Sequence, residues 1–237
     1  MKGIDVSRHN GAINWQCVKD AGIEFAILRA GFGKLVSQKD TTFEENYAEA
    51  KAVGIPVGAY WFSYATTVEE ARQEAEICIS ILREKQFEFP IYFDLEDQRS
   101  LRTGKANCSA MVRAFCDALE QAGYWAGLYT SRSMLQTYID EDIKSRYALW
   151  IAEWGSKLNY SGAVGIWQYS DKGKVDGITG STDLDECYVD YPTQIREAGL
   201  NGYSAPVTND APANEQKTAE IILKIGNDVY KGTLTKA

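Results

Sequence analysis

Segments in which apolar and polar residues alternate recur along the chain. The segment Phe89–Gln98 reads FPIYFDLEDQ, with apolar side chains at every second position. Residues two apart point to the same face of a strand. Tyr92, Asp94 and Glu96 therefore share one face, and the pattern predicts a buried strand that ends in two carboxylates on the same side.

Seven other segments have the composition of strands, and four segments between the early strands have apolar residues at helical spacing. The eight predicted strands are Lys2–Val6, Glu24–Ala30, Pro56–Tyr64, Phe89–Gln98, Tyr124–Thr130, Tyr147–Trp154, Val164–Tyr169 and Ser181–Val189. The predicted helices are a helix capped by Asn14 and running to Asp20, then Phe43–Val53, Thr67–Phe87 and Ser109–Ala122.

Alternation of strands and helices implies a parallel sheet. Eight strands, with helices between the early ones and mostly loops between the last ones, predict a closed α/β barrel of the TIM-barrel type. In such a barrel the chemistry lies at the carboxyl ends of the strands.

The composition changes after Leu200. Residues 201–217 are rich in Pro, Asn, Ala and Ser and read as a linker. We therefore expect a barrel domain over residues 1–200, a linker over 201–217 and a tail over 218–237. The tail is too short to hold a core of its own. It is either the start of a truncated module or a segment that packs back on the barrel.

Composition and motifs exclude several classes of function. The net charge of −8 argues against nucleic acid or an anionic membrane surface as a partner. His9 is the only histidine and the five cysteines form no CxxC pair, so neither a metal site nor a cofactor is indicated. No phosphate-binding or nucleophile-elbow motif is present. No apolar segment is long enough to cross a membrane, and the N-terminus lacks the apolar core of a secretory signal.

The remaining chemistry consists of carboxylates and aromatic rings at the ends of separate strands. Acids that follow a strand are often merely solvated, but Asp5, Asp94 and Glu96 come from two strands whose ends meet at one mouth. A buried carboxyl group beside an ionised neighbour has a raised pKa and can act as a general acid. Paired carboxylates with aromatics are typical of glycoside hydrolases. The residues we expect to bind substrate are Tyr60, Phe62, Tyr129, Trp150, Trp154, Gln168 and Tyr169.

An ordered series of motifs resembles glycoside hydrolase family 25, the lysozymes that act as N-acetylmuramidases in phages and bacteria. The series is GIDVSRHNGAINW, FAILRAGFG, GAYWFSYA, FDLED, YTSRSML, LWIAEW and IWQYSDKGKVDGITGSTDLDE. It extends from about Met1 to about Ile195. The resemblance implies a barrel of five βα units followed by three strands. It also implies cleavage of the β-1,4 bond between N-acetylmuramic acid and N-acetylglucosamine of peptidoglycan.

The resemblance also implies roles for four acids: Asp5, Asp94, Glu96 and Asp183. Glu96 would protonate the leaving oxygen and later act as base. Asp94 would stabilise developing positive charge or orient the 2-acetamido group of the sugar, and either route gives net retention. Asp5 and Asp183 would set the pKa values of this pair. The chain departs from the family at Trp61, where many relatives carry histidine.

The last predicted strand offers two acids on one face, Asp183 and Asp185. If this strand runs antiparallel to the first five, its beginning lies at the mouth. Asp183 would then line the site, and Asp185 would lie about 6–7 Å deeper.

Two other interpretations stay open: an inactive barrel that binds cell-wall sugars, and a chitinase-like glycosidase. The acids of the DxE pair favour an enzyme, and the flanking motifs favour a muramidase. We expect a monomer that acts on the peptidoglycan of the cell wall. Without a signal, it would be held in the host cytoplasm before lysis, as a phage enzyme is, or be secreted by another route.

Overall fold

The computed structural model describes residues 1–205, 218–225 and 228–235. The chain divides into two compact units, Met1–Ala205 and Pro206–Ala237. In the second unit, strands β9 (Thr218–Ile225) and β10 (Asp228–Thr235) form an antiparallel hairpin. The remainder of the predicted tail, and residues 206–217 of the predicted linker, lie outside the described residues.

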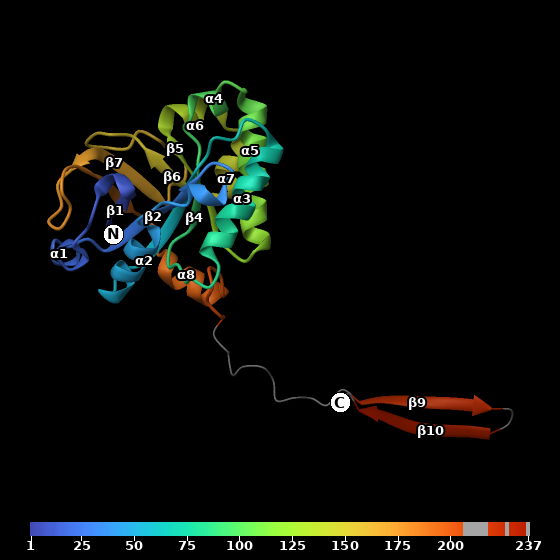
Figure 1. The fold of residues 1–237 in the computed structure, drawn as a ribbon. Coiled ribbons are helices and arrows are strands. Elements are labelled where there is room, and N and C mark those ends of the chain that lie inside the picture. The colour runs from blue at the N-terminus through green and yellow to red at the C-terminus, as the bar shows by residue number, and fades with distance from the viewer. Residues whose placement is uncertain (206–217, 226–227, 236–237) are drawn as a thin grey trace. The chain divides into compact units, whose positions relative to one another are not determined.

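The first unit is a closed barrel of eight strands in chain order (Figure 1). Each strand is parallel to the one before it, except that the last strand is antiparallel to both of its neighbours, β7 and β1. The strands are β1 (Lys2–Val6), β2 (Phe25–Phe32), β3 (Val57–Phe62), β4 (Ile91–Asp94), β5 (Ala126–Ser131), β6 (Ala148–Ala152), β7 (Ile166–Gly173) and β8 (Thr182–Cys187). The predicted barrel is confirmed.

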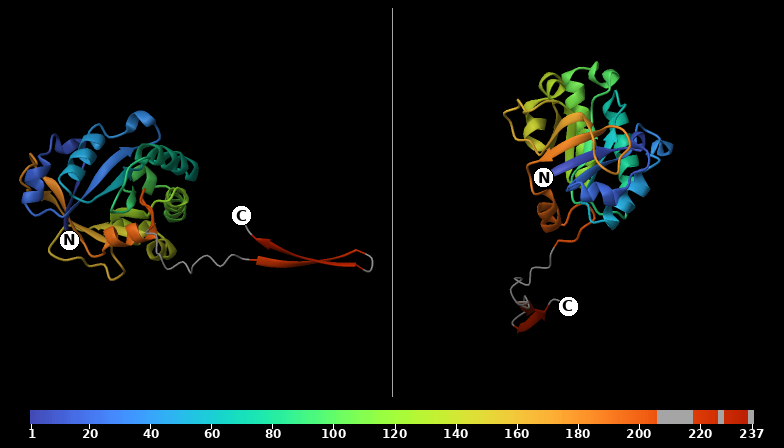
Figure 2. Two further views of the ribbon diagram at one scale, coloured as in Figure 1. Left: turned by 90° about the horizontal axis from the view of Figure 1, so that it is seen from below. Right: turned by 90° about the vertical axis from the view of Figure 1, so that its left-hand side faces the viewer.

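Helices follow each of the first five strands, and none lies between β6 and β7 or between β7 and β8. The helices are α1 (Trp15–Asp20), α2 (Phe43–Ala52), α3 (Val68–Leu82), α4 (Gln98–Leu101), α5 (Lys105–Gln121), α6 (Arg132–Tyr138), α7 (Glu141–Arg146) and α8 (Tyr191–Ala198). Two 3-10 turns cover Arg8–Asn10 and Val36–Gln38. The helices lie outside the ring of strands (Figure 2). The order is that of five βα units followed by three strands.

Most helix starts follow from capping residues in the sequence. The side chain of Asn14 accepts a hydrogen bond from Cys17 N at 3.1 Å, and that of Thr67 accepts one from Glu70 N at 3.2 Å. The predicted end of the third helix at Phe87 is wrong. The helix stops at Leu82 because Arg83 is extended and Glu84 has a φ of 66°, a conformation that no α-helix accommodates.

Two apolar layers hold the barrel together. One lies between the strands and helices and includes Cys78, Cys108 and Cys116, which are buried as small core residues, as predicted. The other fills the barrel interior around Trp150. The Trp150 ring lies 5.3 Å from the ring of Tyr92 and 4.4 Å from that of Tyr129. Aromatic packing of this kind makes a rigid floor beneath the mouth of the barrel.

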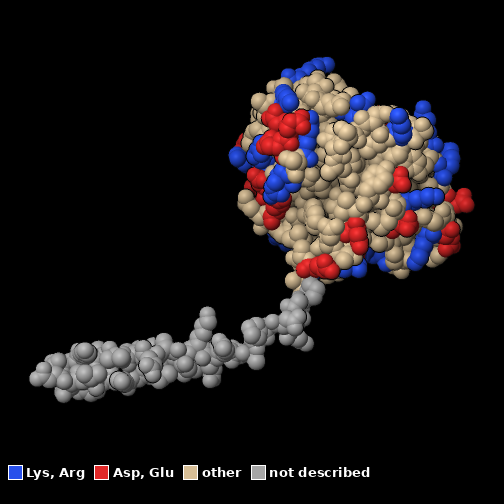
Figure 3. Space-filling view, turned by 180° about the vertical axis from the view of Figure 1, so that it is seen from behind, with Lys and Arg blue, Asp and Glu red and all other residues tan. Residues whose placement is uncertain are grey.

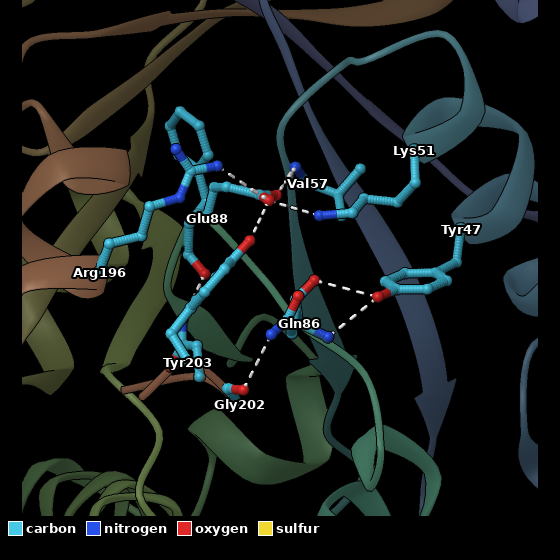
Figure 4. Close-up of polar contacts among 10 residues, drawn as sticks. Tyr47, Lys51, Val57, Gln86, Glu88, Arg196, Gly202 and Tyr203 are labelled. Carbon is cyan, nitrogen blue, oxygen red and sulfur yellow. Dashed lines mark hydrogen bonds and ion pairs between the residues drawn. The ribbon is translucent and has the colours of Figure 1, made fainter. Parts of the chain in front are cut away.

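The amino end of the barrel is closed by a polar cluster centred on Glu88 (Figure 4). The buried Glu88 carboxylate accepts hydrogen bonds from the backbone of Val57 at 3.0 Å and from the side chains of Lys51 and Tyr203. Arg196 of α8 adds an ion pair at 3.4 Å. Because a buried carboxylate is stable only when paired, this cluster fastens the segment after β8 to the barrel.

The segment after α8 belongs to the barrel. Asn201 is fully buried, and its side chain donates to Phe89 O at 2.8 Å and accepts from Trp125 N at 2.7 Å. The compact unit therefore ends at Ala205, five residues beyond the predicted boundary at residue 200.

The charged surface is mixed on the face that Figure 3 shows, where Lys and Arg lie among Asp and Glu along the margins and the middle is uncharged. Within the described residues, no helix combines the length and apolar character needed to cross a bilayer.

Candidate active site

A cavity of about 520 Å³ opens at the carboxyl ends of the barrel strands. It contains every predicted site residue except Tyr169. Its lining consists of Asp5, Ser7, His9, Asn10, Arg29, Tyr60, Phe62, Asp94, Glu96, Tyr129, Trp150, Trp154, Gln168, Asp171, Ser181 and Asp183. The predicted convergence of acids and aromatic rings on one mouth is thus present in the structure.

The pair Asp94 and Glu96 is placed by the end of β4. Asp94 is the last residue of the strand. The backbone of the intervening Leu95 is held by β5, since Leu95 N donates to Tyr129 O at 3.0 Å and Thr130 Oγ1 donates to Leu95 O at 2.7 Å. The Leu95 side chain packs in the layer under the helices. The two acids on either side of it therefore both face the cavity.

The two acids differ in exposure. Asp94 is 3% exposed, whereas Glu96 is only partly buried. Burial, followed by the charge of Glu96, raises the pKa of Asp94 well above its ordinary value. Burial, followed by the charge of Asp183, raises the pKa of Glu96. Both acids thus hold a proton to higher pH than a solvated carboxyl group does.

Gln168 organises one wall of the cavity. Its Nε2 donates to Asp5 Oδ2 at 2.8 Å, which fixes the direction of that carboxylate. Its Oε1 accepts from Tyr129 Oη at 3.0 Å and from Trp154 Nε1 at 3.1 Å. The side chain of Gln168 therefore links an acid on β1 to an aromatic ring on β5 and to another at the rim.

The two acids of β8 lie at different depths. Because β8 runs antiparallel to β1, Asp183 is the register partner of Asp5 and Asp185 that of Gly3. Asp183 lines the cavity. Asp185 is fully buried and accepts a hydrogen bond from Trp150 Nε1 at 2.8 Å. The predicted direction of this strand, with its beginning at the mouth, is confirmed.

Burial is also the main cause of the pKa shifts in this pair. It raises the pKa of Asp183 to about 6, with the charge of Asp171 adding to the shift. It raises the pKa of Asp185 to about 8. Asp5, buried near both, also has a pKa well above its ordinary value, through burial and then the charges of Asp185 and Asp183. The protonation of each of these three carboxyl groups therefore depends on the charge of the others.

Tyr169 does not line the cavity. It follows Gln168 on β7 and its ring lies 5.5 Å from that of Trp167. Since neighbouring residues of a strand face opposite sides, Gln168 and Tyr169 cannot both point inward. The same alternation applies to Trp61, which is buried outside the barrel with Nε1 donating to Gly33 O at 3.1 Å, whereas Tyr60 and Phe62 line the cavity.

Several lining residues were not predicted as site residues: Ser7, His9, Asn10, Arg29, Asp171 and Ser181. Arg29 is the most informative omission. It is buried within β2, where its Nε pairs with Asp40 Oδ2 at 2.6 Å. Its positive charge offsets part of the rise in the pKa of Asp94 that burial and the charge of Glu96 cause. A lone charge inside the apolar segment FAILRAGF was the signal for it.

The chemistry of the cavity is that of carboxyl groups and aromatic rings. Across residues 1–205 and the two described strands of the hairpin, no group of three His, Cys, Asp or Glu is placed to hold a metal ion. A half-buried acid next to a deeply buried one, with an exposed aromatic ring at the rim, suits proton transfer to a glycosidic oxygen.

Comparisons with known proteins give one consistent result. The family model described as "Glycosyl hydrolases family 25" matches residues 4–178. The autolytic lysozyme of Clostridium acetobutylicum is 32% identical over 187 residues, which cover 78% of this chain and 55% of that protein. Lysozyme M1 of Streptomyces globisporus is 30% identical over 199 residues, covering 77% of this chain and 66% of the other. The chain thus spans about half to two thirds of these relatives.

Solved structures agree with this match. The bacterial lysozyme of Streptomyces coelicolor superposes with a TM-score of 0.73 at 25% identity, over 84% of this chain and 96% of that one. The autolysin LytC of Streptococcus pneumoniae, solved in complex with a synthetic peptidoglycan ligand, gives a TM-score of 0.71 at 28% identity. That match covers 79% of this chain and 46% of LytC.

Proposed function

The chain belongs to glycosyl hydrolases family 25, and from this premise we propose that its barrel is a lysozyme that degrades bacterial peptidoglycan. The bond cleaved is the β-1,4 bond from N-acetylmuramic acid to N-acetylglucosamine. The observation that carries the proposal is the placement of Asp94 and Glu96, which face one cavity from the end of a single strand. Lysozymes among the relatives, and the peptidoglycan ligand of LytC, support this substrate.

Glu96 is the general acid in this proposal. It is the more exposed of the pair, so it can reach a glycosidic oxygen that enters from the mouth. Its raised pKa lets the carboxyl hold its proton to a higher pH than a solvated glutamate does. As the bond between the anomeric carbon and the leaving oxygen breaks, the proton passes from Glu96 to that oxygen. The Glu96 carboxylate then accepts a proton from the attacking water.

Asp94 acts through the 2-acetamido group of the substrate. It lies about 6–7 Å deeper along the strand than Glu96, and it is 3% exposed. Its Oδ1 has no hydrogen-bond partner among the described residues. This oxygen is therefore free to accept the acetamido N–H. The acetamido carbonyl oxygen then attacks the anomeric carbon, and water later opens the cyclic intermediate. Two successive inversions give net retention.

The other predicted residues support this pair. Asp183, the register partner of Asp5 on the neighbouring strand, adds its charge to the effect of burial on the pKa of Glu96 and so favours the protonated Glu96 carboxyl. Trp154 is 60% exposed at the rim, with its ring nitrogen held by Gln168. A tryptophan with a free ring face is a common platform for a sugar. We propose that the enzyme works as a monomer on the cell wall.

Mass spectrometry of fragments released from purified cell wall tests the proposed bond specificity. A muramidase leaves N-acetylmuramic acid at each new reducing end. Fragments that end in reducing N-acetylglucosamine, or release from chitin in preference to wall, would show a different glycosidase. Binding to wall without any release would show a sugar-binding barrel. NMR of early products gives the stereochemistry, and the inverted anomer would contradict retention.

A third measurement tests the role of Asp94. A synthetic substrate that carries hydroxyl in place of the 2-acetamido group should bind but not turn over. A covalent adduct between this substrate and Asp94 would show instead that Asp94 is the nucleophile.

A further inference from the structure

A second cavity, of about 480 Å³, opens at the same end of the barrel as the acid cavity. It lies among the loops that follow β2, β3 and β4. The residues that line it are Gly33, Lys34, Leu35, Gln38, Tyr64, Ala65, Thr66, Glu70, Glu74 and Arg99. None of them is a predicted site residue or part of the acid cavity. We refer to it as the β2–β4 cavity.

The two cavities are adjacent, because an aromatic ring of one packs against an aromatic ring of the other. The Tyr64 ring lies 5.0 Å from the ring of Phe62 and 6.2 Å from that of Phe32. Phe62 lines the acid cavity and Tyr64 lines the β2–β4 cavity. The rings of Phe62 and Tyr64 therefore separate a glycan bound at Glu96 from the β2–β4 cavity.

The chemistry of the β2–β4 cavity does not match a sugar subsite. Its one aromatic ring, Tyr64, already packs against two phenylalanines and under the guanidinium of Arg99, which lies 4.8 Å from the ring centroid. Lys34 and Glu70 form an ion pair of 2.6 Å along the lining. Charges of both signs beside an exposed apolar side chain, Leu35, match a peptide better than a neutral sugar.

Glu74 contributes a buried carboxyl group to the lining of this cavity. The residue is 1% exposed, and its Oε1 accepts a hydrogen bond from Tyr64 N at 3.0 Å. Its Oε2 is without a hydrogen-bond partner among the described residues. Burial raises the pKa of Glu74 to about 7. A buried acceptor with no partner is costly, and an N–H donor from a ligand in the cavity would remove that cost.

We propose that the β2–β4 cavity binds the peptide stem carried by the glycan chain, with a stem N–H group donating to Glu74 and an apolar stem side chain against Leu35. This proposal rests on the proposed function, because a peptide stem is attached to the muramic acid of the same substrate. It adds a determinant of specificity, because the enzyme would bind the peptide as well as the sugar of its substrate.

The test compares two soluble glycan chains of equal length, one with its peptide stems and one from which an amidase has removed them. The protein as it stands should cleave both, with a KM about tenfold lower for the peptide-bearing chain. Leu35→Asp should raise the KM for the peptide-bearing chain by about fivefold to tenfold and leave the KM for the peptide-free chain unchanged.

Val36→Asp is the matched control. Val36 is exposed like its neighbour Leu35 but does not line the cavity, so both KM values should stay as in the unchanged protein. Glu74→Gln is a second variant that retains an acceptor for Tyr64 N. It should raise the KM for the peptide-bearing chain alone, with its melting temperature measured alongside to verify folding.

The outcomes separate the two proposals. Cleavage of neither chain contradicts the proposed function. Cleavage of both with equal KM contradicts the peptide site and leaves the proposed function in place. If Leu35→Asp raises the KM for both chains equally, the cavity takes a sugar and the peptide proposal is wrong.

Discussion

Asp5 and Asp183 are directly opposite one another on the antiparallel strands β1 and β8. Like charges in such cross-strand pairs are destabilising. The pair is also close to the buried Asp185, which raises the pKa of Asp5 further. Stability alone would favour a neutral residue in place of one of these two acids. Two acids are expected where the protonation of a nearby catalytic group must be controlled.

We predict that Asp183→Asn reduces turnover far more than Asp185→Asn does. Asp183 lines the cavity, and its charge adds to the effect of burial in raising the pKa of Glu96. Without that charge the pKa of Glu96 falls, and a smaller fraction of Glu96 carries the proton needed for catalysis. Asp185 is one layer deeper and contacts Trp150. Wall clearing by the two variants, measured at equal folded concentration, tests the order. The reverse order would mean that the deeper acid controls Glu96.

Asp185 should make the stability of the barrel depend on pH. Its pKa is about 8 in the folded protein, against an ordinary value of 3.8. Between these values the folded state binds a proton that the unfolded chain releases, so the free energy of unfolding decreases as pH rises through this range. Asp185→Asn removes this contribution. The variant should therefore gain melting temperature relative to the unchanged protein as the pH is raised from about 5 to about 8.

Glu186→Gln is the control for this comparison, because Glu186 is on the exposed face of the same strand. Its melting temperature should follow that of the unchanged protein at every pH. A difference between Asp185→Asn and the unchanged protein that stays constant from mild acid to mild alkali would contradict the assignment.

Glu96→Gln should leave the fold intact and reduce turnover by about 10²–10⁴-fold, the range typical of a lost general acid. The amide fills the same volume but has no proton of suitable pKa to give. Circular dichroism verifies the fold, and release of reducing ends from wall measures turnover. The control is Glu76→Gln, since Glu76 is an exposed acid on α3 that does not line the cavity. Near-normal turnover of the Glu96 variant would remove Glu96 from the mechanism.

A chain that ends at Ala205 should fold and retain full activity, whereas a chain that ends at Leu200 should be much less stable. The shorter chain lacks Asn201 and Tyr203, which bond to Phe89, Trp125 and Glu88. Breaking a buried hydrogen-bonded network costs several kcal/mol, about 3–5 for one charged pair. Melting temperatures of the two chains measure this. If both melt alike, the contacts of the last five residues contribute nothing.

Most of the site was predictable because it depends on the two-residue period of a strand. That period places Asp94 and Glu96 together, and the direction of β8 separates Asp183 from Asp185. The same rule, applied to Gln168 and Tyr169, would have excluded Tyr169. The barrel was predictable from the alternation of strands and helices, because each strand and helix is recognised from the residue pattern of its own segment.

The rest depends on contacts between distant residues. Nothing local to Asn201 shows that its side chain will bond to Trp125, 76 residues earlier. The helix α8 was not predicted, although its sequence carries local signals. Asp190 caps it by accepting from Thr193 N, Pro192 is in its first turn, and Gly199 ends it with a φ of 66°. Glu74 and Tyr64 likewise meet through the fold alone.

The reversal of β8 also decides where a fusion partner can be attached. Because seven strands run one way and the eighth returns, the barrel begins and ends at the same rim, where Met1 N donates to Cys187 O at 2.9 Å. The acids are at the opposite rim. A tag or capture domain joined to Met1 should thus leave the acid cavity open.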